Sequence, residues 1–88
     1  MAKYSELGAL ERFLKLGEIH AKAELLIEAA SVFHVDHIFA GIQDFFRDQG
    51  VPEGDFLVKL QAKVQAKKDA NTKNVNAVFE ALASLPRN

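Results

Sequence analysis

The chain has 88 residues, no cysteine and a formal net charge of −1, with 49% hydrophobic and 26% charged residues. This composition is typical of a folded globular domain; it excludes a disordered chain and gives no overall attraction to nucleic acid or to an anionic membrane. No run approaches the roughly 20 apolar residues of a transmembrane helix, and the N-terminus lacks the apolar stretch of a signal peptide. We therefore expect one cytoplasmic domain over residues 1–88.

The first third of the chain predicts helices at about 5–16 and 18–33. Their apolar residues recur at steps of three and four, which is the helical signature: Leu7, Leu10, Leu14, then Ile19, Ala23, Leu26, Ala30 and Phe33. Gly17 is the only candidate break between the two helices. Because a glycine inside a helix costs only about 1 kcal/mol, a single long bent helix remains an open alternative.

Asp36 is a good N-cap for the next helix, since its carboxylate can accept hydrogen bonds from free backbone amides. The apolar residues of this helix are Ile38, Phe39, Ile42, Phe45 and Phe46. Gly50 is expected to end it, and Val51-Pro52-Glu53-Gly54 is the clearest turn in the chain.

Asp55 offers a cap for a helix that runs to about Lys68. The polar segment 69–72 is expected to break it, and Pro86 to close a last helix whose stripe is Val75, Val78, Phe79, Leu82 and Leu85. No strand-like alternation occurs in the sequence. The predicted fold is all-α, with four to five short helices in a bundle or an orthogonal array.

The histidines are the only candidates for a metal site. His20 and Glu24 lie one helical turn apart, and His34 or His37 could add a nitrogen ligand. The tight paired spacings of structural metal sites are missing, and His34 and His37 flank a predicted helix start. The favoured interpretation is that both are turn residues, so neither a metal nor another cofactor is expected.

The sequence also argues against an enzyme. Ser31 lies three residues before His34, but no third orienting group and no oxyanion site can be identified. Carboxylate pairs such as Asp44 and Asp48 are spaced as on a solvated helix face.

Nucleic-acid binding is a weaker alternative. Residues 30–36 are similar to a helix-turn-helix, but His34 stands where that turn normally holds glycine, and the following helix presents Asp44 and Asp48 toward phosphates of the same sign. A lysine stripe is the better candidate, although such a stripe is usually a solvated face: Lys59, Lys63, Lys67, Lys68 and Lys73.

Protein contact is the function that the residues favour. A domain of this size buries only about 60 to 65% of its unfolded surface, and without disulfides a second subunit or a partner is the leading way to add stability. Adjacent Phe45 and Phe46 point about 100° apart on a helix, so both cannot face one neighbouring helix.

We therefore predict a non-catalytic interaction module of the adaptor, assembly-factor or inhibitor type. It is expected to bind another protein and to self-associate, with a dimer favoured, through an aromatic-rich helix. The expected interface residues are Phe39, Ile42, Phe45, Phe46 and Phe56, and the expected rim charges are Asp44, Asp48, Lys59, Lys63 and Lys67.

Overall fold

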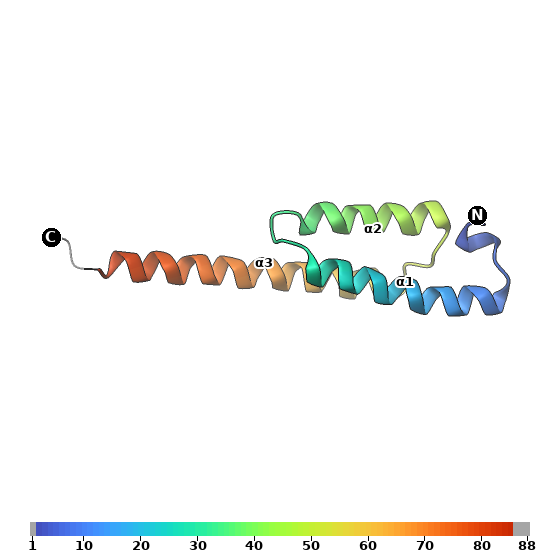
Figure 1. The fold of residues 1–88 in the computed structure, drawn as a ribbon, viewed down its shortest axis with the longest axis horizontal. Helices are drawn as coiled ribbons and strands as arrows, with labels where there is room; N and C mark the ends of the chain where they lie inside the picture. The colour runs from blue at the N-terminus through green and yellow to red at the C-terminus, as the bar shows by residue number, and fades with distance from the viewer. Residues whose placement is uncertain (1, 86–88) are drawn as a thin grey trace.

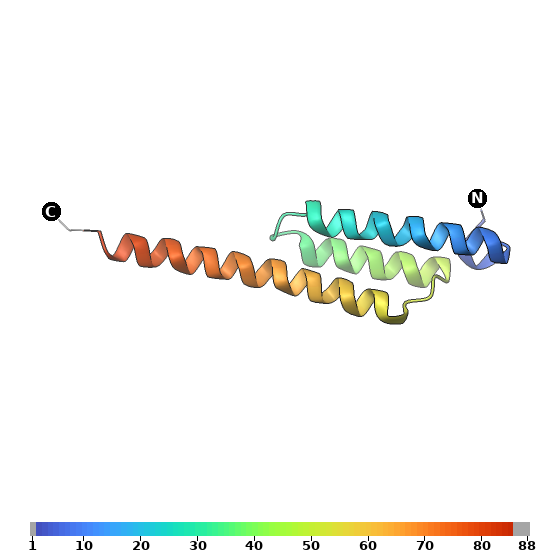
Figure 2. The same cartoon turned by 90° about the horizontal axis from the view of Figure 1, so that it is seen from below.

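The computed structural model describes residues 2–85, and the regular structure within this range is helical. A short 3-10 helix, η1 (Tyr4–Glu6), precedes three α-helices: α1 (Ala9–Ala29), α2 (Val35–Gln49) and α3 (Gly54–Ala83). Helix α2 runs back along α1, and α3 then runs in the direction of α1 beside both (Figures 1 and 2). The all-α class is confirmed; the described residues form three α-helices in a bundle, fewer than the four to five expected.

The candidate break at Gly17 and the predicted break at residues 69–72 both lie inside continuous helices, so the alternative of a single long helix across Gly17 is confirmed. Helix α1 passes through Gly17, which is exposed, and no atom outside its own stretch of helix lies within 4 Å of the place where a Cβ would stand. Helix α3 passes through the polar segment 69–72. Within it Asp69 Oδ1 accepts a hydrogen bond from Gln65 Nε2 at 2.9 Å, and Thr72 Oγ1 donates to the Lys68 carbonyl at 3.1 Å. Both bonds join residues one turn apart, so they are compatible with a helix.

The two predicted helix caps, Asp36 and Asp55, each lie two residues after the observed N-cap residue. Helix α2 begins at Val35, one residue before Asp36, and the N-cap residue His34 makes no side-chain capping bond. Asp36 instead lies in the first turn, where a carboxylate is favourable to the helix dipole. Asp55 lies likewise in the first turn of α3, whose N-cap residue is Glu53.

Gly50 ends α2 as predicted. Its φ of 70° is left-handed, and the Val51 amide donates to the Phe46 carbonyl at 2.9 Å. This bond closes a Schellman motif, which favours glycine at the left-handed position. The motif turns the chain so that Val51 is buried in the core. The helix end predicted at Pro86 lies outside the described residues.

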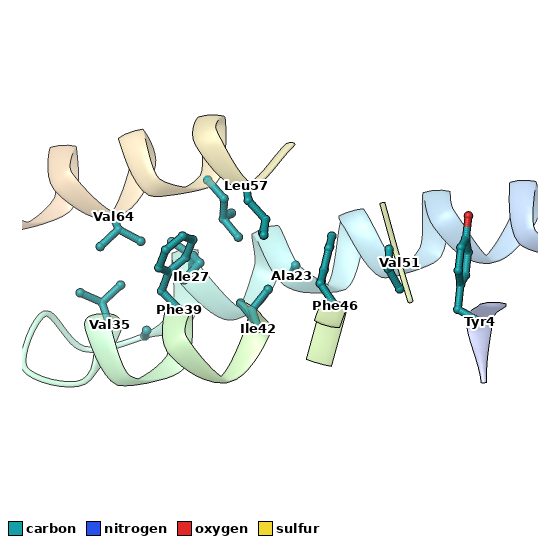
Figure 3. Packing of buried hydrophobic residues seen from close by; sticks show 12 residues of the cluster. Tyr4, Ala23, Ile27, Val35, Phe39, Ile42, Phe46, Val51, Leu57 and Val64 are labelled. Atoms are coloured by element: carbon teal, nitrogen blue, oxygen red, sulfur yellow. The ribbon is translucent and has the colours of Figure 1, made fainter. Parts of the chain in front are cut away.

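The core of the bundle lies between α1, α2 and the first half of α3. Figure 3 shows side chains from these helices pointing toward one another, and the largest fully buried ones are Phe46, Ile27, Leu60 and Val35. Helix α3 contributes only Leu57, Leu60 and Val64 to the buried set. Beyond Lys68, which still pairs with Asp36 of α2, the helix leaves the bundle, and Figure 1 shows α3 projecting past the other two helices. The described chain measures 70 × 18 × 16 Å. We call residues 69–85 the arm.

Lysine side chains of α3 attach it to the other helices. Lys67 Nζ donates to the carbonyls of Ile27 and Glu28, each at 2.8 Å, and to that of Ala30. A cation there satisfies carbonyls that the end of α1 leaves without an intrahelical partner. Lys63 forms an ion pair with Glu24 of α1 at 3.6 Å.

Candidate functional site

His20 is part of an aromatic cluster in the bundle. Its ring stacks on Phe56 with centroids 3.8 Å apart and lies 6.3 Å from Phe46, and all three rings are within 3° of parallel. Its Nε2 atom is buried without a hydrogen-bond partner among residues 2–85. Burial disfavours the imidazolium and lowers the pKa of His20 below its ordinary value, an effect that the Glu24 carboxylate offsets only in part.

The candidate metal ligands are not brought together. In the part of the chain that the structure describes, no group of three or more His, Asp or Glu side chains could hold a metal ion. His34 and His37 are exposed at the start of α2, and Glu24 pairs with Lys63. The geometry therefore assigns His20 a packing role in the bundle.

The expected rim charges are spread over different faces. Asp44 pairs with Arg47 at 2.6 Å, whereas Lys63 and Lys67 contact α1. Lys68 pairs with Asp36 of α2 at 3.0 Å. Asp48 and Lys59 are exposed. Much of the lysine stripe thus holds α3 against the bundle.

The five expected interface residues divide between the core and the surface. Phe39, Ile42 and Phe46 are buried within the chain, and Ile42 and Phe46 also line the groove described below. Phe56 is half-buried against His20. Phe45 remains 46% exposed beside Phe46, which is 1% exposed. The divergence of the two adjacent rings is therefore confirmed, and Phe45 is the large apolar side chain that α2 leaves exposed.

The side of α2 that carries Phe45 forms one wall of an apolar groove of about 450 Å³. Helix α1 contributes Ile19, Lys22, Ala23 and Leu26, and α2 contributes Ile38, Gly41, Ile42, Phe45 and Phe46. None of these residues belongs to α3, which packs on the other side of the α1–α2 pair. Gly41 has no atom near its missing Cβ. Its open side therefore permits a close approach by another backbone.

The groove continues toward the N-terminal segment. A second hollow of about 370 Å³ shares Ile19, Lys22 and Phe45 with the first and reaches Tyr4 and Leu7. Its rim is charged on the α1 side, where Glu18 accepts hydrogen bonds from Lys22 at 2.7 Å and from Lys15 at 3.4 Å. Both lysines, with Lys22 having the larger effect, hold the pKa of Glu18 below its ordinary value. The α1–α2 groove, comprising both hollows, has an apolar floor and a rim with excess positive charge.

The arm carries the largest run of exposed apolar side chains on α3. They are Val75, Val78, Phe79, Leu82 and, just after the helix, Leu85, between 42% and 66% exposed. The sequence pattern identified this stripe but assigned it to a separate helix. Its exposure could be recognised only once α3 was seen to leave the bundle, and the α1–α2 groove gave no signal in the sequence.

No helix among residues 2–85 is both long enough and apolar enough to span a membrane. Comparison of the chain with models of protein families, with curated proteins and with solved structures found no significant match.

Proposed function

We propose that the protein is a non-catalytic protein-protein interaction module that binds an amphipathic helix in its α1–α2 groove. The single observation that carries the proposal is an open apolar groove between two helices, with Gly41 on one wall. Grooves of this kind accept the apolar face of a helix, whose side chains enter at positions i, i+3, i+4 and i+7. An adaptor, an assembly factor or an inhibitor would each act in this way.

The exposure of the groove walls supports this function. Leu26 is 52% exposed and Phe45 is 46% exposed, and they stand on opposite walls. Burying a large apolar side chain fully stabilises a complex by about 1.5 to 3 kcal/mol. A helix that covers the exposed part of both side chains therefore gains a substantial part of the free energy that a specific contact requires.

The alternatives receive less support from the same geometry. Lys63, Lys67 and Lys68 are engaged by α1 and α2, which reduces the positive charge available to a nucleic acid. His20 is packed against phenylalanine rings instead of facing other metal ligands. Neither arrangement favours a nucleic-acid or metal-binding function.

Photo-cross-linking tests the proposal. A photoreactive phenylalanine analogue replaces Leu26 on the groove wall in cells that make the protein naturally, and the matched control replaces Val58, which is 67% exposed on α3. We expect a discrete protein adduct from position 26, lost when Phe45→Glu is added, and none from position 58. No adduct at position 26, or one that Phe45→Glu leaves unchanged, would contradict the proposal.

A further inference from the structure

We infer that the α1–α2 groove is filled by the arm of a second copy of this chain. The exchange is reciprocal, so each of two antiparallel chains gives an arm and receives one. This inference rests on the proposed function of the groove as a helix-binding site.

The lengths of the helices match this arrangement. Helix α3 has 30 residues and α2 has 15, so α3 is twice as long as the helix that forms one wall of the groove. Its first half packs in its own bundle, and its second half is a rod of roughly 20 Å at 1.5 Å per residue. Because α3 is continuous and leads away from the bundle, the arm cannot reach the groove of its own chain (Figure 1).

The apolar face of the arm continues the face that α3 buries in its own bundle. Val78 and Leu85 follow Leu57 and Val64 at intervals of seven residues, with Asn71 between them. A seven-residue step returns a helix to nearly the same side. The apolar side chains of the arm therefore point to the same side of α3 as the side chains that α3 buries against its own α1–α2 pair. Its own pair covers the first half of this face, and the pair of a second copy would cover the second half.

A two-fold axis near the junction of Lys68 and Asp69 produces this contact on both chains. The axis places the bundled half of each α3 at the same height as the arm of the partner chain. Each arm lies in the groove of the partner's α1–α2 pair, on the side of that pair opposite the partner's own α3. Both α3 helices then run antiparallel for their full length, with one α1–α2 pair at each end. The arrangement closes on itself, as a symmetric dimer must.

The side chains of the arm are complementary to the groove. Val75, Val78, Phe79 and Leu82 follow the i, i+3, i+4, i+7 spacing of a helix that docks in a groove. The polar residues before Val75 lie at the junction between the two bundles, where the α1–α2 groove ends. An isolated helical segment of this length is marginal in water, so a docked position also accounts for the arm being a helix.

The mass of the full-length protein tests the exchange. Light scattering at tens of micromolar should give twice the 9.7 kDa of one chain. Phe79→Glu in the arm and Phe45→Glu on the groove wall should each reduce the mass to that of a monomer, because each charge would be buried unpaired in both contacts. Val58→Glu, an exposed position on the bundled half of α3, should leave the dimer intact. Circular dichroism verifies that each variant keeps the bundle.

The outcomes separate this inference from the function on which it rests. A monomeric wild-type protein overturns the exchange. A dimeric Phe45→Glu variant together with a monomeric Phe79→Glu variant also overturns it, because the two arms would then pair with each other instead of with the grooves. If the wild type is monomeric and position 26 still cross-links to a different protein, the exchange fails and the interaction function stands. A monomer with no adduct at position 26 removes both.

Discussion

His20 connects the packing of the bundle to its pH dependence. Its ring lies against Phe56, and its pKa is lowered because burial disfavours the charged form. The unfolded chain therefore binds a proton near pH 6.5 that the folded chain does not yet bind. The stability that neutral His20 contributes is fully present above this pH and is lost as the pH falls toward the folded-state pKa.

We predict that His20→Phe weakens the pH dependence of unfolding between pH 7 and pH 5. A single proton gives a slope of at most about 1.4 kcal/mol per pH unit. Urea denaturation at several pH values measures it, with His37→Gln, an exposed histidine, as the matched control. An identical pH slope in wild type and His20→Phe would show that the buried ring does not determine the response.

Lys67 is the residue whose side chain contacts the most carbonyl groups at the end of α1. We predict that Lys67→Met, which keeps the length of the side chain but removes its donors, lowers the free energy of unfolding by about 1 kcal/mol. The carbonyls of Ile27, Glu28 and Ala30 lose this partner. Lys59→Met on the same helix is the control and should change stability by less than about 0.5 kcal/mol. Equal effects of the two substitutions would contradict the capping role.

At the scale of elements, apolar spacing predicts where helices lie better than it predicts where they end. The Gly50 stop was predictable because a left-handed residue after a helix favours glycine. The breaks at Gly17 and at 69–72 do not occur, because one glycine costs little and the polar residues bond within the helix. Because α3 continues through residues 69–72, the apolar stripe predicted for a separate last helix lies on the projecting half of α3.

The continuous α1 helix leads to a prediction of increased stability. Gly17→Ala should raise the free energy of unfolding by about 0.5 to 1 kcal/mol, because alanine loses less backbone entropy in a helix and its Cβ meets no neighbour. For a domain of this size the melting temperature should rise by roughly 2 to 8 °C. A thermal scan by circular dichroism measures it. A lower melting temperature would mean that α1 bends or breaks at this glycine.

The proposed binding surface was predictable in part, because only some of its features follow from helical geometry alone. Adjacent Phe45 and Phe46 indicated that one ring stays accessible, because that conclusion needs only helical geometry. Which ring is buried, and that Phe39 and Ile42 are buried with it, depends on where α1 and α3 pack. The groove combines residues of α1 and α2 that are distant in sequence, so no local pattern identifies it.

At the scale of the whole molecule, the central feature is a bundle with one open groove and one projecting apolar arm. In a single chain the two cannot meet, because α3 carries the arm away from the bundle (Figure 2). In a reciprocal pair both are covered, and the short bundle of each chain gains a fourth helix. The added apolar burial in such a pair would also compensate for the small core that a chain of this length can form.

Cysteine cross-linking tests this claim most directly, because the natural chain has no cysteine and only introduced thiols can react. Two variants, Phe45→Cys on the groove wall and Leu82→Cys on the arm, are mixed and treated with a short bifunctional thiol reagent. The exchange predicts a cross-linked pair in the mixture and none with Leu82→Cys alone, since the two-fold axis separates the two arm ends. No cross-link in the mixture, or an efficient one between two Leu82→Cys chains, would contradict the exchange.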